Sequence, residues 1–229
     1  MALNDENCIG LHTTLPSFAG PPFRKSTVFG SIFRATKTLL QLAVPSLFFD
    51  EYDRSTFKNL FYYIAEQGGY FHIQATRPNT LSYALSDSPV GLTAYLLEKF
   101  DEWSDAEEGP MSTEEGKKQI ISNIILYHCT NTISSSMRFY YEFCHSNEGL
   151  LSSSPKYVQT PTAVLYFGRE ILKSPKDWIE AFYNLKRYTR HETGGHFPSL
   201  ESNSRKMLVS DIFEFFLHIQ NEKPKDKEL

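Results

Sequence analysis

The distribution of apolar side chains predicts helices through the middle of the chain, from about residue 31 to residue 144. A first helix is predicted over 50–67, and the two glycines that follow would end it. Ser88 and Pro89 are a helix start signal, with serine at the cap and proline at the first helical position. The acidic segment 104–117 contains glycine and proline and is predicted to be an exposed loop. The helical positions form four groups: Phe57, Leu60, Phe61 and Ile64; Leu92, Tyr95, Leu96, Lys99 and Phe100; Ile120, Ile124 and Tyr127; Met137, Tyr140, Tyr141 and Cys144.

Short apolar strands are predicted on both sides of this helical region. One covers 8–12, and no partner strand is visible within the next hundred residues, which suggests that earlier strands of the sheet are missing. After a serine-rich break at 152–155 the order is strand, helix, strand and helix, over 162–167, 175–182, 185–188 and 200–219. Alternating strands and helices predict a parallel α/β sheet, here interrupted by a helical cap.

This pattern divides the chain into four predicted parts. Residues 1–30 would be the end of a first core segment, and 31–150 a helical cap or lid. Residues 151–221 would be the C-terminal α/β units, and 222–229 a mobile charged tail in which lysines alternate with acidic residues.

Composition excludes several classes of function. The chain has 229 residues, a net charge of -4 and three cysteines. No basic stripe is present to neutralise phosphates, so no nucleic-acid partner is expected. Three cysteines are too few for a disulfide scaffold, and the spacing of Cys129 and Cys144 with His128 and His145 matches no zinc pattern, so neither metal nor cofactor is expected. No apolar run reaches the length of a membrane span, so the chain alone is expected to be soluble.

Glu170 and His196 are the strongest candidates for chemistry. Each follows a predicted strand, and functional groups in parallel sheets gather at the carboxyl ends of strands. An acid after one strand and a histidine after the next is the order of an α/β-hydrolase triad, in which the acid orients the imidazole. The alternative is that Glu170 is a carboxylate at a helix start and His196 a loop residue. His191 is a minor competitor for the histidine.

A block of the cap carries a resemblance to a known family. The run Gly-Tyr-Phe-His-Ile-Gln-Ala-Thr-Arg-Pro over 69–78, continuing through Asp-Ser-Pro-Val-Gly-Leu at 87–92 and Leu-Glu-Lys-Phe at 97–100, resembles the cap of the microsomal epoxide hydrolases. The insect juvenile hormone epoxide hydrolases share this block. Weaker matches lie at 10–12, 135–140, 161–162 and 194–197, so the resemblance covers most of the chain.

The resemblance implies a fold, a reaction and site residues. The fold is the C-terminal part of an α/β-hydrolase with a mainly helical cap, without its N-terminal strands. In the family an aspartate attacks an epoxide, a histidine–acid pair activates water to hydrolyse the ester to a diol, and two cap tyrosines donate to the epoxide oxygen. By this likeness Tyr70 and Tyr140 resemble the tyrosines, Glu170 the acid and His196 the base. Each tyrosine could instead pack in the core, and Tyr141 directly follows Tyr140.

The resemblance also sets limits. The aspartate elbow, the His-Gly-Trp-Pro type loop and the membrane-anchoring N-terminus of the family have no match in this sequence. We therefore expect a fragment that lacks the nucleophile, whose full-length relatives associate with the endoplasmic reticulum membrane and act on xenobiotic or lipid epoxides. The expected partners are a small apolar epoxide and water. The alternative is a non-catalytic remnant that binds an apolar ligand or a protein partner; a dehalogenase would share the acid and histidine but not the block over 69–100.

Overall fold

The computed structural model describes residues 7–16, 36–37, 39–41, 43–146 and 157–222. The elements in chain order are β1 (Leu11–Thr13), η1 (Pro45–Leu47), α2 (Glu51–Tyr62), η2 (Tyr63–Gln67, a π-helical turn), α3 (Gly69–Thr76), α4 (Pro78–Asp87), α5 (Pro89–Trp103), η3 (Pro110–Ser112), α6 (Glu114–Thr130), α7 (Ile133–His145), β2 (Val158–Tyr166), α8 (Lys176–Glu180), β3 (Tyr183–Arg190), η4 (Pro198–Leu200) and α9 (Ser202–Glu222).

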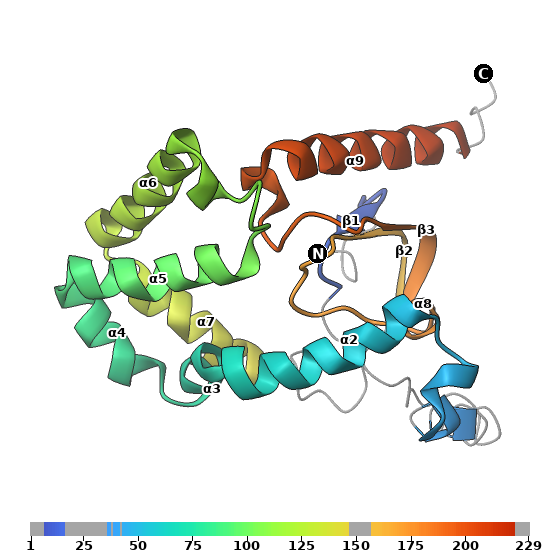
Figure 1. Cartoon of the computed structure of the whole chain (residues 1–229), viewed down its shortest axis with the longest axis horizontal. Coiled ribbons are helices and arrows are strands. Elements are labelled where there is room, and N and C mark those ends of the chain that lie inside the picture. Colours follow the sequence, from blue (N-terminus) through green and yellow to red (C-terminus); the bar gives the residue numbers. More distant parts are fainter. Residues whose placement is uncertain (1–6, 17–35, 38, 42, 147–156, 223–229) are drawn as a thin grey trace.

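The strands form a parallel sheet with helices on both faces (Figure 1). Among the described residues the order is β1-β2-β3, so β2 lies in the centre, with Leu11 opposite Thr162 and Thr162 opposite Leu185. Alternate side chains of β2 point to opposite faces. Ala163 packs against α9, whereas Val164 and Tyr166 pack against α8. The α/β fold predicted from the order of elements is confirmed, and residues distant in the sequence meet at one sheet.

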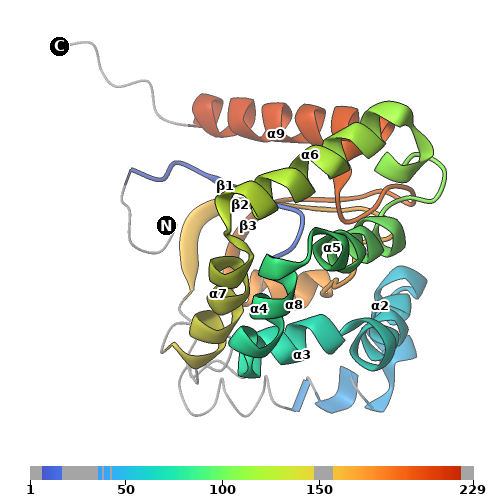
Figure 2. The same cartoon turned by 90° about the vertical axis from the view of Figure 1, so that its left-hand side faces the viewer.

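The helices α3 to α7 form a second body beside the sheet (Figures 1 and 2). Its core contains side chains from α4, α5, α6 and α7, and Leu92 and Met137 are fully buried there. Ser88 caps α5 by accepting a hydrogen bond from the Gly91 amide at 3.0 Å, as the start signal predicts. The predicted helices over 50–67, 120–127 and 137–144 are confirmed.

One detail differs from the sequence predictions. The segment 104–117 is only partly a loop, since Thr113 accepts from the Gly116 amide and begins α6 at residue 114. After the two glycines the chain resumes a helix at Gly69, so His72 lies in α3. The apolar side chains at the end of the first helical segment are exposed: Phe61 is 72% and Ile64 62% exposed. The serine-rich break at 152–155 and the tail after residue 222 lie outside the described residues.

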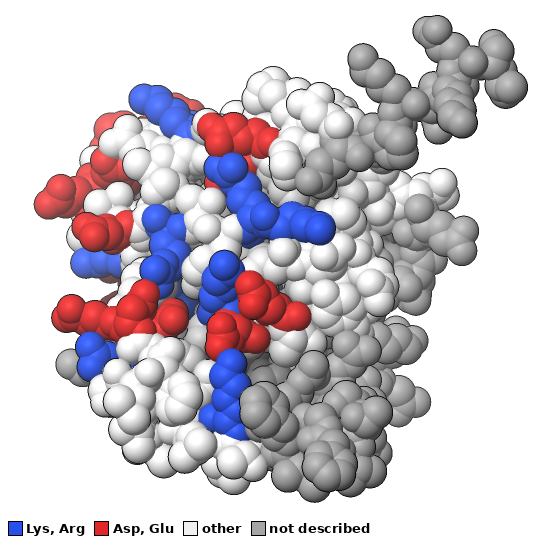
Figure 3. All heavy atoms as spheres, turned by 90° about the vertical axis from the view of Figure 1, so that its right-hand side faces the viewer, with Lys and Arg blue, Asp and Glu red and all other residues white. Residues whose placement is uncertain are grey.

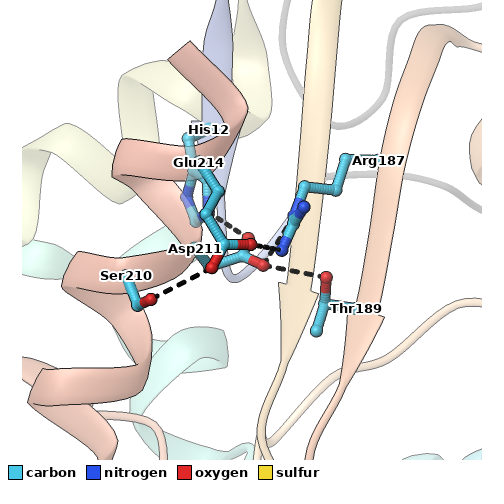
Figure 4. A network of polar contacts seen from close by, with 6 residues as sticks. All are labelled: His12, Arg187, Thr189, Ser210, Asp211 and Glu214. Carbon is cyan, nitrogen blue, oxygen red and sulfur yellow. Dashed lines mark hydrogen bonds and ion pairs between the residues drawn. The ribbon is translucent and has the colours of Figure 1, made fainter. Parts of the chain in front are cut away.

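A buried polar network joins α9 to the two outer strands (Figure 4). Asp211 of α9 accepts hydrogen bonds from Arg187 at 2.7 Å and Thr189 at 2.9 Å, both on β3, and His12 of β1 lies 2.8 Å from its other oxygen. Arg187 also contacts Glu214 at 2.7 Å. One carboxylate therefore joins the helix to both outer strands across the central strand.

One face of the molecule is mixed in charge: in Figure 3, basic and acidic side chains lie interspersed over the part of this face that carries charge. No helix among the described residues has both the length and the apolar character that crossing a bilayer requires.

Candidate active site

His196 and Glu170 meet at the carboxyl edge of the sheet, each in the loop after a strand. The His196 Nδ1 atom lies 2.5 Å from Glu170 Oε1, and that oxygen also accepts from the Ile171 amide at 2.8 Å. The glutamate side chain is fully buried, whereas the imidazole is 20% exposed. A carboxylate at Nδ1 fixes that nitrogen as the donor, which leaves Nε2 as the free basic atom. His191 lies apart, with its ring against Phe167.

Two backbone hydrogen bonds align the acid and histidine loops. Gly168 N donates to Thr193 O at 3.1 Å, and Arg169 N donates to Gly194 O at 2.8 Å. Gly194 has a φ of 87°, a conformation that favours glycine. Glu170 and His196 are therefore held side by side by their own backbones.

A buried carboxylate attaches the histidine loop to the end of α5. Glu201 is fully buried, and its two oxygens accept from the Gly195 amide at 2.7 Å and the Asp105 amide at 3.0 Å. Asp105 in turn accepts from the Gly194 amide at 3.1 Å, and His196 N donates to Trp103 O at 2.8 Å. These bonds fix the position of the histidine relative to the helical body.

At Gly195 the histidine loop packs tightly against Glu201 and the end of α5. A Cβ there would lie 2.4 Å from Glu201 Oε1 and 2.6 Å from Trp103 O, closer than real contacts allow. We expect Gly195→Ala to lower the free energy of unfolding by about 1–3 kcal/mol, because the loop must shift and the buried Glu201 loses a donor. Urea unfolding followed by circular dichroism measures this. Gly69→Ala is the matched control, since nothing lies within 4 Å of a Cβ there and it should not destabilise. Equal effects of both substitutions would contradict the packing argument.

The two candidate tyrosines lie together in the helical body. Tyr70 of α3 and Tyr140 of α7 make an edge contact, with ring centroids 5.9 Å apart and planes at 81°. Tyr141 instead stacks on His145 and is 36% exposed. The structure therefore places Tyr140, and not Tyr141, beside Tyr70.

Trp103 lies between the tyrosines and the histidine. Its ring is 5.2 Å from the ring of Tyr70 and 5.5 Å from that of His196, and the indole nitrogen donates to Gln67 at 3.0 Å. The Lys99 ammonium lies 5.3 Å from the ring centroids of both Tyr70 and Trp103. The four predicted site residues therefore belong to one continuous group of aromatic and polar contacts.

Burial keeps the phenols of this cluster protonated. It is the largest cause that raises the pKa of Tyr140 to about 12, and it raises the pKa of Tyr70 still further, with a contribution from Tyr63. Burial also raises the pKa of Tyr95 to about 12, and Tyr140 and Tyr70 add to that rise through their charge. The Tyr95 hydroxyl is buried without a hydrogen-bond partner among the described residues. Neutral phenols can donate to an oxygen on which negative charge develops.

Three contributors to this site did not stand out in the sequence. Trp103 and Glu201 act through contacts between residues distant in the sequence, which spacing does not reveal. Tyr63 lies seven positions before Tyr70, about two helical turns, and that spacing was an available signal. The described residues contain no group of three or more His, Cys, Asp or Glu side chains arranged to hold a metal ion.

Comparison with curated proteins identifies relatives of one kind. The chain is 35% identical over 194 residues to epoxide hydrolase 1 of Sus scrofa, which covers 81% of the chain and 39% of that protein. It is 35% identical over 220 residues to the juvenile hormone epoxide hydrolase of Manduca sexta, covering 91% of the chain and 44% of that protein. The chain therefore spans less than half the length of these curated relatives. No family profile matches it.

Solved structures give the same result for the fold. The crystal structure of juvenile hormone epoxide hydrolase from the silkworm Bombyx mori matches 94% of the chain and 50% of its own, with a TM-score of 0.71 and 29% identity. The epoxide hydrolase of Aspergillus niger matches 95% of the chain and 48% of its own, with a TM-score of 0.70; at 22% identity this likeness concerns the fold alone. The described residues correspond to the C-terminal part of an α/β-hydrolase fold with its helical cap.

Proposed function

We propose, from the premise that the chain belongs to the epoxide hydrolase family, that it supplies the epoxide-polarising and water-activating groups of an epoxide hydrolase. The observation that carries the proposal is the joint placement of an acid–histidine pair and a phenol pair on either side of Trp103. The reaction converts an epoxide to a vicinal diol through an ester, and its nucleophile would be the aspartate that the family carries upstream of the matched region.

Tyr70 and Tyr140 would act when the strained ring opens. Negative charge then develops on the epoxide oxygen, and two buried, neutral phenols can donate to it. The Tyr140 hydroxyl makes no hydrogen bond within the described part of the chain, so its proton is available to a ligand. Tyr70 lies against Tyr140 with their rings in edge contact, which supports a shared target.

His196 would act when the ester is hydrolysed. Its Nε2 atom would take a proton from water while Glu170, at 2.5 Å from Nδ1, orients the ring and stabilises the imidazolium. Glu170 Oε2 is buried and has no hydrogen-bond partner among the described residues. The carboxylate is thus incompletely satisfied in the described part of the structure, which supports a functional role.

The substrate would be a small apolar epoxide of xenobiotic or lipid origin, with water as the second reactant. This rests on the aromatic rings around Tyr70 and on the relatives, among them the juvenile hormone epoxide hydrolase of Manduca sexta. Because the sequence resembles the microsomal epoxide hydrolases, we also infer that the protein resides at the endoplasmic reticulum membrane.

A matched pair of ligands tests the phenol assignment on the 229-residue chain. A phenyl-substituted epoxide should bind about 30-fold more tightly than phenylcyclopropane, which has the same shape but no acceptor, because two net hydrogen bonds contribute about 1 kcal/mol each. Tryptophan fluorescence measures both affinities, since Trp103 lies against Tyr70. The double variant Tyr70→Phe/Tyr140→Phe should bind both ligands equally.

Tyr141→Phe is the control for this experiment. Its ring stacks on His145 rather than on Tyr70, so the preference for the epoxide should persist. Equal binding of the two ligands to the unmodified chain would count against the proposed function.

A further inference from the structure

A third tyrosine contacts the phenol pair from a rare backbone element. The helix α2 continues past Tyr62 into the π-helical turn Tyr63–Gln67, and α3 begins two residues later at Gly69. Such turns are uncommon and recur at functional sites, because the wider turn changes which side chains face one another. Here the Tyr63 and Tyr70 hydroxyl oxygens lie 2.9 Å apart.

The shared hydrogen bond fixes how the two protons are distributed. Both hydroxyls are neutral at physiological pH, since burial is the largest cause that raises the pKa of each. One proton lies between the two oxygens, and the other remains for a third acceptor. When Tyr63 is the donor, the Tyr70 oxygen is an acceptor on one side and its own proton points elsewhere. A phenol that accepts one hydrogen bond becomes a stronger donor in another, because bonds in a chain polarise one another.

This contact makes the two cap tyrosines unequal. Tyr70 has a hydroxyl partner, whereas the Tyr140 hydroxyl has none in the described part of the chain. Tyr140 is nevertheless close enough for its charge to raise the pKa of Tyr63. Three phenols therefore converge, and only one pair among them is joined by a hydrogen bond.

We propose that Tyr63 is a positioning residue that donates to the Tyr70 hydroxyl and so directs the Tyr70 proton toward the oxygen of the bound ligand. This rests on the proposed function of Tyr70. In that arrangement the direction of the Tyr70 proton is set by Tyr63, and Tyr140 supplies an unassisted second bond. Tyr63 does not touch the ligand, and it acts only through Tyr70.

The experiment is a double-mutant cycle read with the same ligand pair on the 229-residue chain. Tyr63→Phe should reduce the preference for the phenyl-substituted epoxide over phenylcyclopropane about threefold, with the affinity for the cyclopropane unchanged. In a Tyr70→Phe background, Tyr63→Phe should have no further effect, because its partner is already absent. Tyr62→Phe, at the neighbouring exposed position, should leave the preference unchanged. A thermal melt of each variant accompanies the binding data.

The outcomes separate this inference from the proposed function. If Tyr70→Phe lowers the preference and Tyr63→Phe does not, the role of Tyr63 is wrong while the function of Tyr70 stands. If Tyr63→Phe weakens both ligands equally, or still acts in the Tyr70→Phe background, Tyr63 is a packing residue and the inference is overturned. If the unmodified chain shows no preference, both the inference and the proposed function are wrong.

Discussion

His196→Ala is expected to cause the largest loss of activity, about 10²- to 10⁴-fold in turnover, the usual contribution of a general base. The test needs a nucleophile, so the chain is joined to the half of the Bombyx mori juvenile hormone epoxide hydrolase that it does not match. The chimera should convert a phenyl-substituted epoxide to the diol. With His196→Ala, ring opening should still occur, and the ester should accumulate because no base activates water. Intact-mass spectrometry would then show a protein heavier by one substrate molecule.

The matched control for this experiment is His191→Ala. His191 is five positions away, and its ring packs against Phe167. It should leave turnover within a few-fold of the parent. Normal turnover after His196→Ala, or loss of the ester itself rather than its accumulation, would reject the assignment of His196 as the base for ester hydrolysis.

The sequence was sufficient to predict the parts of the site that follow from chain order. Glu170 and His196 each lie in the loop that follows a strand, and parallel strands end at the same edge, so chain order alone predicts that they lie close together, as their 2.5 Å contact shows. The cap tyrosines depended on the resemblance, because helical spacing alone cannot distinguish a donor from a core ring. Once the helices are in place, Tyr140 packs on Tyr70, and Tyr141 stacks on His145.

The parts that could not be predicted are created by contacts between distant residues. The acidic segment 104–117 has the composition of an exposed loop, yet Ser104 is buried there. Its Asp105 bonds the histidine loop through Gly194 and Glu201. Glu201 resembles any helix-start acid in sequence, and only the folded chain shows both its oxygens buried against backbone amides. Phe61 and Ile64 show the opposite case, because their apolar side chains are exposed. An amphipathic pattern predicts a helix, but it does not specify which part of the protein covers the apolar face of that helix.

Asp211→Asn is expected to produce the largest loss of stability. Asp211 is buried and accepts bonds from Arg187 and Thr189, with His12 beside its second oxygen (Figure 4). Removing its charge weakens every bond to this buried acceptor, although Arg187 keeps Glu214 as a partner, and a hydrogen bond to a charged group contributes about 1.5–3 kcal/mol. Urea unfolding of the 229-residue chain measures this. Glu214→Gln is the matched control, because the same arginine contacts Glu214 at the exposed surface, where a pair contributes about 0–1 kcal/mol.

Acid should weaken the same network. Burial alone would raise the pKa of Asp211, but hydrogen bonds from His12, Arg187 and Thr189 lower it from 3.8 to about 2. A carboxyl with a depressed pKa in the folded state stabilises the fold above its unfolded pKa, and that contribution disappears as the pH falls toward 2. We expect a loss of about 2 kcal/mol between pH 4 and pH 2 from this group. Asp211→Asn should remove that part of the pH dependence. If the free energy of unfolding falls as steeply between pH 4 and pH 2 in the variant as in the parent, other carboxylates cause the acid sensitivity. A smaller fall in the variant would identify Asp211 as the acid-sensitive link between α9 and the two outer strands.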